Sequence, residues 1–176
     1  MSLIAKRGSS GDYEMAPEGT QQAVCCDVVD LGDHPNPYKP GKTQRKILVV
    51  WQLETTKADG TRHLTHKRYT LSLDERAVLG HDLESWRGKH FTKEELDGFD
   101  VERLVGANAL LNIIHNTAGD KTYANVASVS PLARGMVKLK AENYVRPDYI
   151  AGWIAKTPAQ TDDGDERMLD ADDIFA

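Results

Sequence analysis

The feature that most constrains the fold is residues 43–54 (TQRKILVVWQLE), a run rich in β-branched and apolar side chains. A turn signal, Ala-Asp-Gly at 58–60, follows directly. Residues 63–73 then supply a second run, with Tyr69 and Leu71 in phase on one face. Two such runs around a short Gly-containing turn are typical of an antiparallel hairpin. The sequence therefore predicts a β-hairpin at the centre of the domain.

A first strand precedes this hairpin at residues 22–31 (QAVCCDVVDL). Residues 32–41 hold three prolines and two glycines, so we expect a loop long enough to carry function. Cys25 and Cys26 are neighbours, and neighbouring side chains on a strand point to opposite faces. They are therefore expected to be two free thiols, as in a reducing cytoplasm. Residues 1–19 are Gly/Ser-rich and aperiodic, which predicts a flexible N-terminal arm.

Helices are expected after the third strand. Residues 74–86 have a helical composition, and Thr92 with Glu95 forms the pattern of a capping box. Asp100 begins another short helix, with Gly106 at a position suited to its C-terminal end. Two further strands, 109–116 and 121–129, flank a tight turn at 118–120.

Three strands, helices and two strands form the connectivity of the OB barrel, whose outer face commonly binds oligonucleotides. We therefore predict a mainly β domain, a five-stranded OB-like barrel with helices between strands three and four. An α+β sheet with a helical cap is the competing fold. We assign residues 20–157 to this domain and expect residues 135–149 to pack against the barrel.

The acidity of the chain is concentrated at its C-terminus. The chain has 22 Lys and Arg, 27 Asp and Glu, and a net charge of −5. Residues 162–176 hold seven acids and one base, so the body without them has 21 basic and 20 acidic residues. Such a segment has too little apolar surface to fold alone, so residues 158–176 are predicted to be a disordered tail. Its tip is the candidate site for partner proteins: Asp172, Asp173, Ile174 and Phe175.

These features resemble the single-stranded DNA-binding proteins, particularly small phage-encoded replication and recombination proteins of that class. The resemblance rests on the strand order, the acidic tip, and the blocks LESWRG (83–88), FT (91–92), LVG (104–106) and YANV (123–126). It implies a protein of the bacterial host cytoplasm that coats single-stranded DNA and recruits replication or recombination proteins. It implies no enzymatic activity and no cofactor. The chain departs from the bacterial pattern by ending Ile-Phe-Ala, without a proline.

Binding single strands requires cations along a groove and flat side chains on which bases stack. Trp51 and Tyr69 share strand parity with apolar neighbours, so we assign both to the core. Arg68 alternates away from Tyr69 and is expected to project outward, as a phosphate contact should. The candidate DNA-binding residues are Tyr38, Lys39, Lys42, Arg45, Lys46, Arg62, Lys67, Arg68, Trp86, Arg87, Lys121 and Tyr123.

Enzymatic alternatives find little support. Residues 40–43 (PGKT) mimic the end of a P-loop, but the earlier glycine is missing and a strand is predicted to follow. His63 and His66 are expected on opposite faces of a strand, which does not suit a shared zinc ion. No apolar stretch approaches the roughly 20 residues of a membrane span. The remaining alternatives are a protein-interaction adaptor and a small metal-dependent nuclease using Asp27, Asp30, Glu54 and His115.

Overall fold

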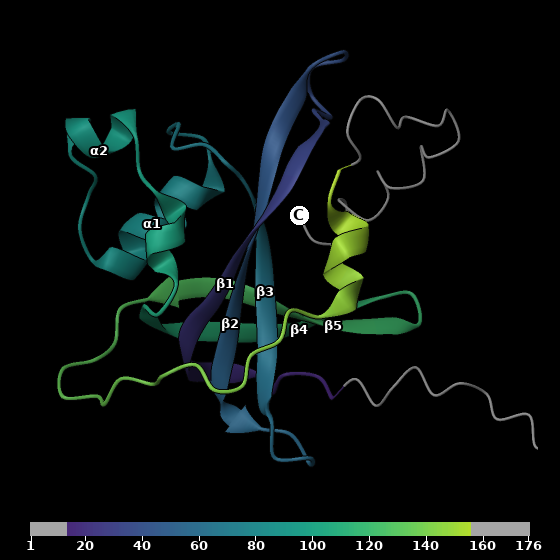
Figure 1. The fold of residues 1–176 in the computed structure, drawn as a ribbon, viewed down its shortest axis with the longest axis vertical. Helices are drawn as coiled ribbons and strands as arrows, with labels where there is room; N and C mark the ends of the chain where they lie inside the picture. Colours follow the sequence, from purple (N-terminus) through teal and green to yellow (C-terminus); the bar gives the residue numbers. More distant parts are fainter. Residues whose placement is uncertain (1–13, 156–176) are drawn as a thin grey trace, which may run out of the picture.

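The computed structural model describes residues 14–155. They form one five-stranded antiparallel sheet in the order β3-β2-β1-β4-β5, with helices between β3 and β4 (Figure 1). The predicted mainly β fold with a helical insertion is confirmed. The elements are β1 (Gly19–Pro35), β2 (Thr43–Thr56), β3 (Arg62–Thr70), α1 (Val78–Arg87), α2 (Lys93–Asp97), the 3-10 helix η1 (Val101–Leu104), β4 (Asn108–Ala118), β5 (Lys121–Ser130) and the 3-10 helix η2 (Asp148–Trp153).

β1 is the strand that joins the two parts of the sheet. Its first half pairs with β4, from Gly19 opposite Ile113 to Val24 opposite Asn108. The pairing with β2 runs further, to Pro35, so β1 extends beyond its predicted end. A bulge between Cys25 and Asp27 lets the strand bend away from β4.

The sheet is not closed into a barrel, so of the predicted OB-like barrel the structure shows the five antiparallel strands and the helical insertion. Within residues 14–155 no ladder of hydrogen bonds joins the edge strands β3 and β5. α1 packs against both edge strands, and its apolar side chains Leu79, Leu83 and Trp86 belong to the main core.

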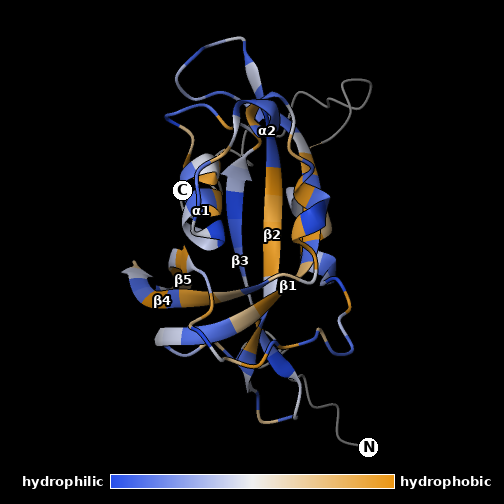
Figure 2. Ribbon diagram, turned by 90° about the vertical axis from the view of Figure 1, so that its left-hand side faces the viewer, coloured by the Kyte–Doolittle hydropathy of each residue, from blue (hydrophilic) through white to orange (hydrophobic). Residues whose placement is uncertain are grey.

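The main core lies between the curved sheet and α1. Trp51 is fully buried and its ring centroid lies 5.8 Å from that of Trp86. Tyr69 is also buried, so the assignment of Trp51 and Tyr69 to the core is confirmed. Cys25 belongs to this core and Cys26 to the opposite face, as predicted. Figure 2 shows the hydrophobic centre of β2, which supplies side chains to both faces.

A second core lies on the outer face of β1 and β2. It consists of Val29, Leu31, Leu48, Val50 and Ile150, and Ile150 comes from η2. We call residues 137–155 the strap, because this segment crosses the outer face of β1, β2 and β3. The prediction that residues 135–149 pack against the sheet is confirmed.

The predicted capping box at Thr92 and the predicted helix start at Asp100 are both confirmed. The Thr92 side chain accepts from the backbone N–H of Glu95, and the Glu95 side chain accepts from the backbone N–H of Thr92. Asp100 caps η1, and Gly106 has a φ of +91°, a conformation that favours glycine. α1 begins at Val78 rather than at the predicted residue 74. No helix among residues 14–155 is long and apolar enough to span a membrane.

The predicted N-terminal boundary needs correction. Ala16 is 2% exposed within the main core, and the Glu14 carboxylate accepts from the backbone N–H of Ala58. Residues 14–19 are therefore part of the folded domain rather than of an arm. The rest of the predicted arm and the acidic tail, with Asp172, Asp173, Ile174 and Phe175, lie outside the described residues.

Candidate nucleic-acid interface

The β1–β2 tip, residues 36–42, projects from the sheet at the top of Figure 1. The Asn36 side chain accepts from the backbone N–H of Tyr38 at 2.9 Å, and Lys42 N–H donates to the Lys39 carbonyl at 3.0 Å. Gly41 has a φ of +76°, which allows the sharp turn into β2. These bonds hold the turn, in which Tyr38 is 90% exposed and Lys39 and Lys42 are exposed as well. A tip that presents an exposed ring close in sequence to two cations suits a flexible polyanion.

Below this tip the predicted cations are already hydrogen bonded within the chain. Arg45 pairs with Asp30, and this hydrogen bond holds the pKa of the Asp30 carboxyl below its usual range. Lys46 Nζ donates to Thr70 Oγ1 at 2.9 Å. The Arg68 guanidinium lies 3.2 Å from Nδ1 of buried His34, on the outward side that its alternation predicted. These groups form a basic surface. Arg45, Lys46 and Arg68 already have hydrogen-bond partners within the chain, so a ligand would have to share or replace those partners.

Three predicted DNA contacts point into the domain instead. Trp86 is 7% exposed and its Nε1 donates to the Asn108 carbonyl at 2.7 Å, so its ring lies in the core. The Arg87 guanidinium lies 4.5 Å from the Phe91 ring centroid, and its side chain is 16% exposed. Lys67 shares the inward face of Tyr69 and pairs with Asp82 of α1 at 2.8 Å. Alternation alone did not reveal that α1 covers this end of β3.

The β4–β5 hairpin carries the last two predicted residues. Lys121 is exposed beside the two-residue turn at 119–120, and Tyr123 is half-buried opposite Asn116. This hairpin projects to the right in Figure 1, and in that view η2 stands between it and the β1–β2 tip. The structure therefore puts Tyr38 and Tyr123 on separate projecting hairpins.

Amide side chains hold the strap by its backbone. Asn108 donates to the Leu139 carbonyl at 2.9 Å and accepts from the Leu139 N–H at 2.8 Å. Gln52 makes the same pair of bonds with Glu142, at 2.7 and 2.8 Å. Each two-bond contact imitates the pairing of a neighbouring strand and satisfies backbone groups next to a buried surface. The strap thus covers the outer face of β2 and takes the place of water as the hydrogen-bond partner of Gln52.

A carboxylate anchors the next part of the strap. Asp27 accepts from the Tyr144 hydroxyl at 2.7 Å and from Nε and Nη2 of Arg146 at 2.7 and 2.9 Å. Burial acts to raise the pKa of Asp27, but the hydrogen bonds from Arg146 and Tyr144 outweigh it and lower that pKa. The charged form of Asp27 therefore stabilises the docked strap.

Three rings from β3 and η2 pack against one another at tilted angles on this outer face. The Trp153 centroid lies 5.0 Å from that of His66 and 5.2 Å from that of Tyr149. Tyr149 is 47% exposed, whereas His66 is buried enough that its pKa falls to about 4. The sequence reasoning missed this aromatic group, although Tyr149 and Trp153 stand four residues apart in a segment with few other signals.

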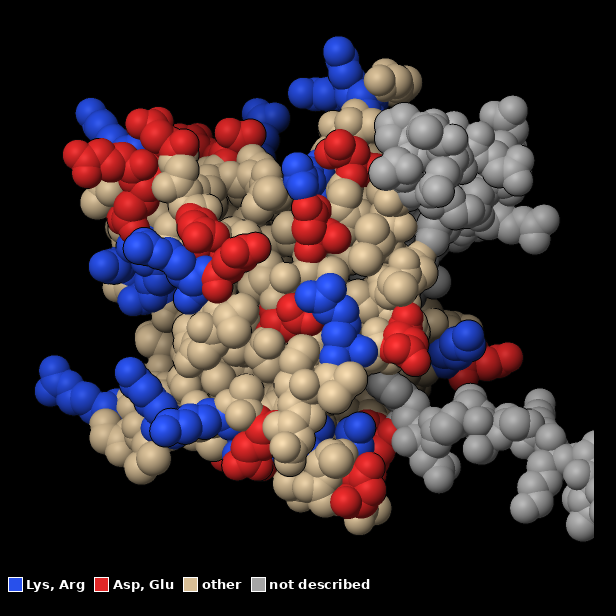
Figure 3. Space-filling model, in the orientation of Figure 1, with Lys and Arg blue, Asp and Glu red and all other residues tan. Residues whose placement is uncertain are grey.

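The chain before and within the strap is basic. Arg134, Lys138 and Lys140 are exposed, and no acidic residue occurs from 131 to 141. Figure 3 shows basic side chains at the top, where the β1–β2 tip projects, and along the loop at the lower left, whereas acidic ones gather over α2. The sequence analysis did not predict these three cations as DNA contacts, because it expected residues 135–149 only to pack against the barrel. The absence of acidic residues from 131 to 141 is the sequence signal that could have indicated them.

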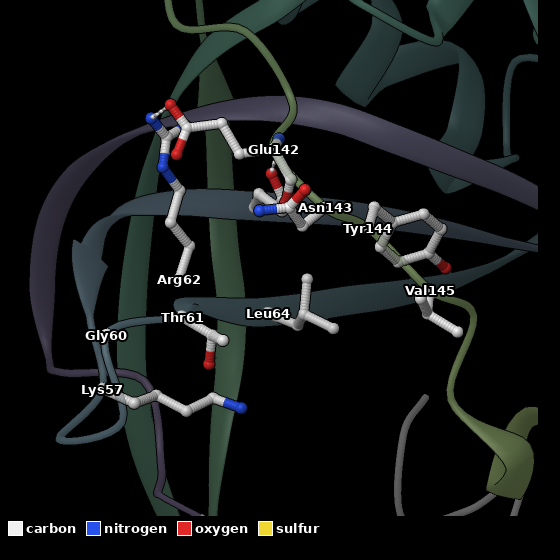
Figure 4. A pocket seen from close by; sticks show the side chains of 10 residues that line it. Lys57, Gly60, Thr61, Arg62, Leu64, Glu142, Asn143, Tyr144 and Val145 are labelled. Atoms are coloured by element: carbon white, nitrogen blue, oxygen red, sulfur yellow. Dashed lines mark hydrogen bonds and ion pairs between the residues drawn. The ribbon is translucent and has the colours of Figure 1, made fainter.

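A hollow of about 210 Å³ lies where the strap passes the β2–β3 turn. Figure 4 shows the Lys57 side chain reaching toward it, with Leu64 beside it and Val145 on the far side. Arg62, a predicted DNA contact, lies in the wall, where it pairs with Glu142 at 3.1 Å and donates to the Lys140 carbonyl at 3.0 Å. The hollow combines a cation, an apolar surface and amide groups.

The carboxylates of the nuclease hypothesis lie in separate contacts. Asp27 is bound by the strap, Asp30 by Arg45, and Glu54 by the backbone N–H of Gln22, while the His115 ring contacts the Ala16 carbonyl. In the part of the chain that the structure describes, no three His, Cys, Asp or Glu side chains are grouped as metal ligands would be. Burial raises the pKa of Cys25 and of Cys26 to about 12, so neither is an activated nucleophile.

The chain matches no protein-family model and no curated protein.

Proposed function

We propose that this protein binds single-stranded DNA through an OB-like domain, with little sequence preference. The observation that carries the proposal is the β1–β2 tip, which presents a 90% exposed Tyr38 together with exposed Lys39 and Lys42. The strand order supports it, because β1 pairs with both β2 and β4 and the insertion separates β3 from β4. OB folds are partly open barrels that bind oligonucleotides on the β2–β3 face and on the β1–β2 and β4–β5 loops.

The proposed path runs over the strap. Because the strap covers the centre of the β2–β3 face, the DNA contacts its outer surface as well as the two hairpins. Lys121 and Tyr123 on the β4–β5 hairpin then serve as a second contact, separate from the tip. Single strands suit this surface better than a duplex, because an exposed ring can stack only on an unpaired or splayed base.

The acidic tail is proposed to recruit replication or recombination proteins. Its carboxylates suit a basic rim, and Ile174 with Phe175 suits an apolar pocket. A protein-interaction adaptor that uses the same tail without binding DNA is the second candidate function, favoured by the concentration of charge in that segment.

Titration with poly-dT over a range of salt concentrations tests the proposal. We expect log K to fall linearly with log salt, with a slope of about −0.7 per neutralised phosphate. A duplex of the same length is expected to compete poorly. Failure to shift an unstructured oligonucleotide at low salt would reject DNA binding and leave the adaptor. Cleavage that depends on magnesium would instead indicate a nuclease.

A further inference from the structure

Two cations, Arg62 and Lys57, line the hollow beside the strap, and they differ in their partners. Arg62 in its wall is neutralised by Glu142 and holds the Lys140 carbonyl. Lys57, by contrast, forms no ion pair within residues 14–155 and reaches toward the space in Figure 4. Hydrogen bonds from Thr61 and the charge of Lys57 lower the pKa of Asp59, but Lys57 forms no ion pair with that carboxylate. An incoming anion can therefore reach Lys57 without breaking an ion pair.

The remaining walls suit a flat, partly apolar group. Leu64 and Val145 supply apolar surface, and Val145 is 79% exposed although it stands beside a hollow. Asn143, which also lines the space, has a φ of +49°, a rare conformation for a residue other than glycine. Its amide offers both a donor and an acceptor. A volume of about 210 Å³ is below the roughly 300–1,000 Å³ of pockets for drug-sized ligands, so the ligand is small.

Exposed basic residues of the strap also lead toward the hollow. The strap reaches it from Lys138 and Lys140, and the Lys140 carbonyl is bonded to Arg62 in its wall. A chain of phosphates that follows these cations would arrive beside Lys57.

We propose that this hollow receives one nucleotide of a bound single strand, with its base against Leu64 and Val145 and its phosphate at Lys57. The inference rests on the proposed function and adds to it a defined subsite, remote from the β1–β2 tip. It also gives the strap a role in binding, because residues 142–145 of the strap supply four of the ten residues that line the hollow.

Two variants of the full chain test the subsite. Lys57→Gln removes the cation and is expected to weaken poly-dT binding roughly threefold to tenfold at low salt, with a salt slope smaller by about 0.7. Val145→Glu puts a carboxylate at the rim and is expected to weaken binding while the thermal midpoint stays unchanged, because Val145 is exposed. Lys93→Gln, on α2 at the other end of the molecule in Figure 1, is the matched control and is expected to bind as the unaltered protein does.

The outcomes separate the two proposals. If the unaltered protein does not bind poly-dT, the proposed function itself fails. If it binds and Lys57→Gln keeps both its affinity and its salt slope, only the subsite is overturned. A direct contact is measured with 5-iodouracil oligonucleotides, for which we expect photocrosslinks to the strap peptide that contains Tyr144. Crosslinks confined to the β1–β2 tip would overturn the subsite.

Discussion

At the residue scale, a substitution at Tyr38 is expected to change DNA affinity without changing the stability of the fold. Its side chain is 90% exposed, so Tyr38→Ala removes almost no packing. If its ring stacks on a base, the change costs roughly 1–3 kcal/mol of DNA affinity while the salt slope stays nearly constant. Fluorescence titration and thermal melting measure the two effects. Tyr38→Phe keeps the ring and is expected to bind normally; equal affinity for Tyr38→Ala would contradict stacking at the tip.

Trp86 is expected to behave in the opposite way. It packs against Trp51 and its Nε1 donates to the Asn108 carbonyl, so Trp86→Ala leaves a cavity and an unpaired carbonyl. The expected loss of unfolding free energy is roughly 3–5 kcal/mol. Denaturant unfolding measures it. A Trp86→Ala protein with normal stability and lost DNA binding would show that the original assignment of Trp86 to the interface was the better one.

At the scale of elements, the strap is expected to respond to acid through His66 and Asp27. Burial lowers the pKa of His66 from 6.5 to about 4, so between these values the unfolded chain binds a proton that the folded chain does not. Stability is therefore lost as the pH falls from about 6.5 toward 4. The lowered pKa of Asp27 acts at still lower pH, because its contribution is lost as the pH falls through the folded value.

Melting temperatures measured across this pH range check the prediction. His66→Phe keeps a ring against Trp153 and removes the titrating group, so its profile is expected to be flatter between pH 6.5 and 4. An unchanged profile would assign the acid sensitivity to other groups.

At the scale of the whole molecule, charge is divided between the body and the tail. Removing residues 162–176 changes the net charge from −5 to about +1. If the tail competes with DNA for the basic surface, this truncation tightens binding at low salt. The gain is expected to fade as the screening length falls to about 8 Å near physiological ionic strength. Titrations at two salt concentrations measure this difference, and a gain that is independent of salt would argue against electrostatic competition.

Local patterns determined much of the framework. The alternation in residues 43–54 predicted β2 and assigned Trp51 to the core, because the period of a strand fixes which side chains share a face. The alternation in residues 63–73 likewise put Arg68 on the face opposite Tyr69. The capping box at Thr92 predicted the start of α2, because both of its hydrogen bonds are local.

Only the tertiary structure decided what covers each face. Arg87 and Lys67 were predicted as DNA contacts, but Glu95 and Asp82 neutralise them on a surface that α1 and its neighbours create. The outer face of β2 is covered by a strap whose Glu142 meets Gln52 across 90 positions of the chain. The period of a strand predicts that a side chain points away from the core. It does not predict whether a segment distant in the sequence packs over that side chain. The position of the candidate interface depends on that long-range contact, because burial and charge pairing are properties of the assembled fold.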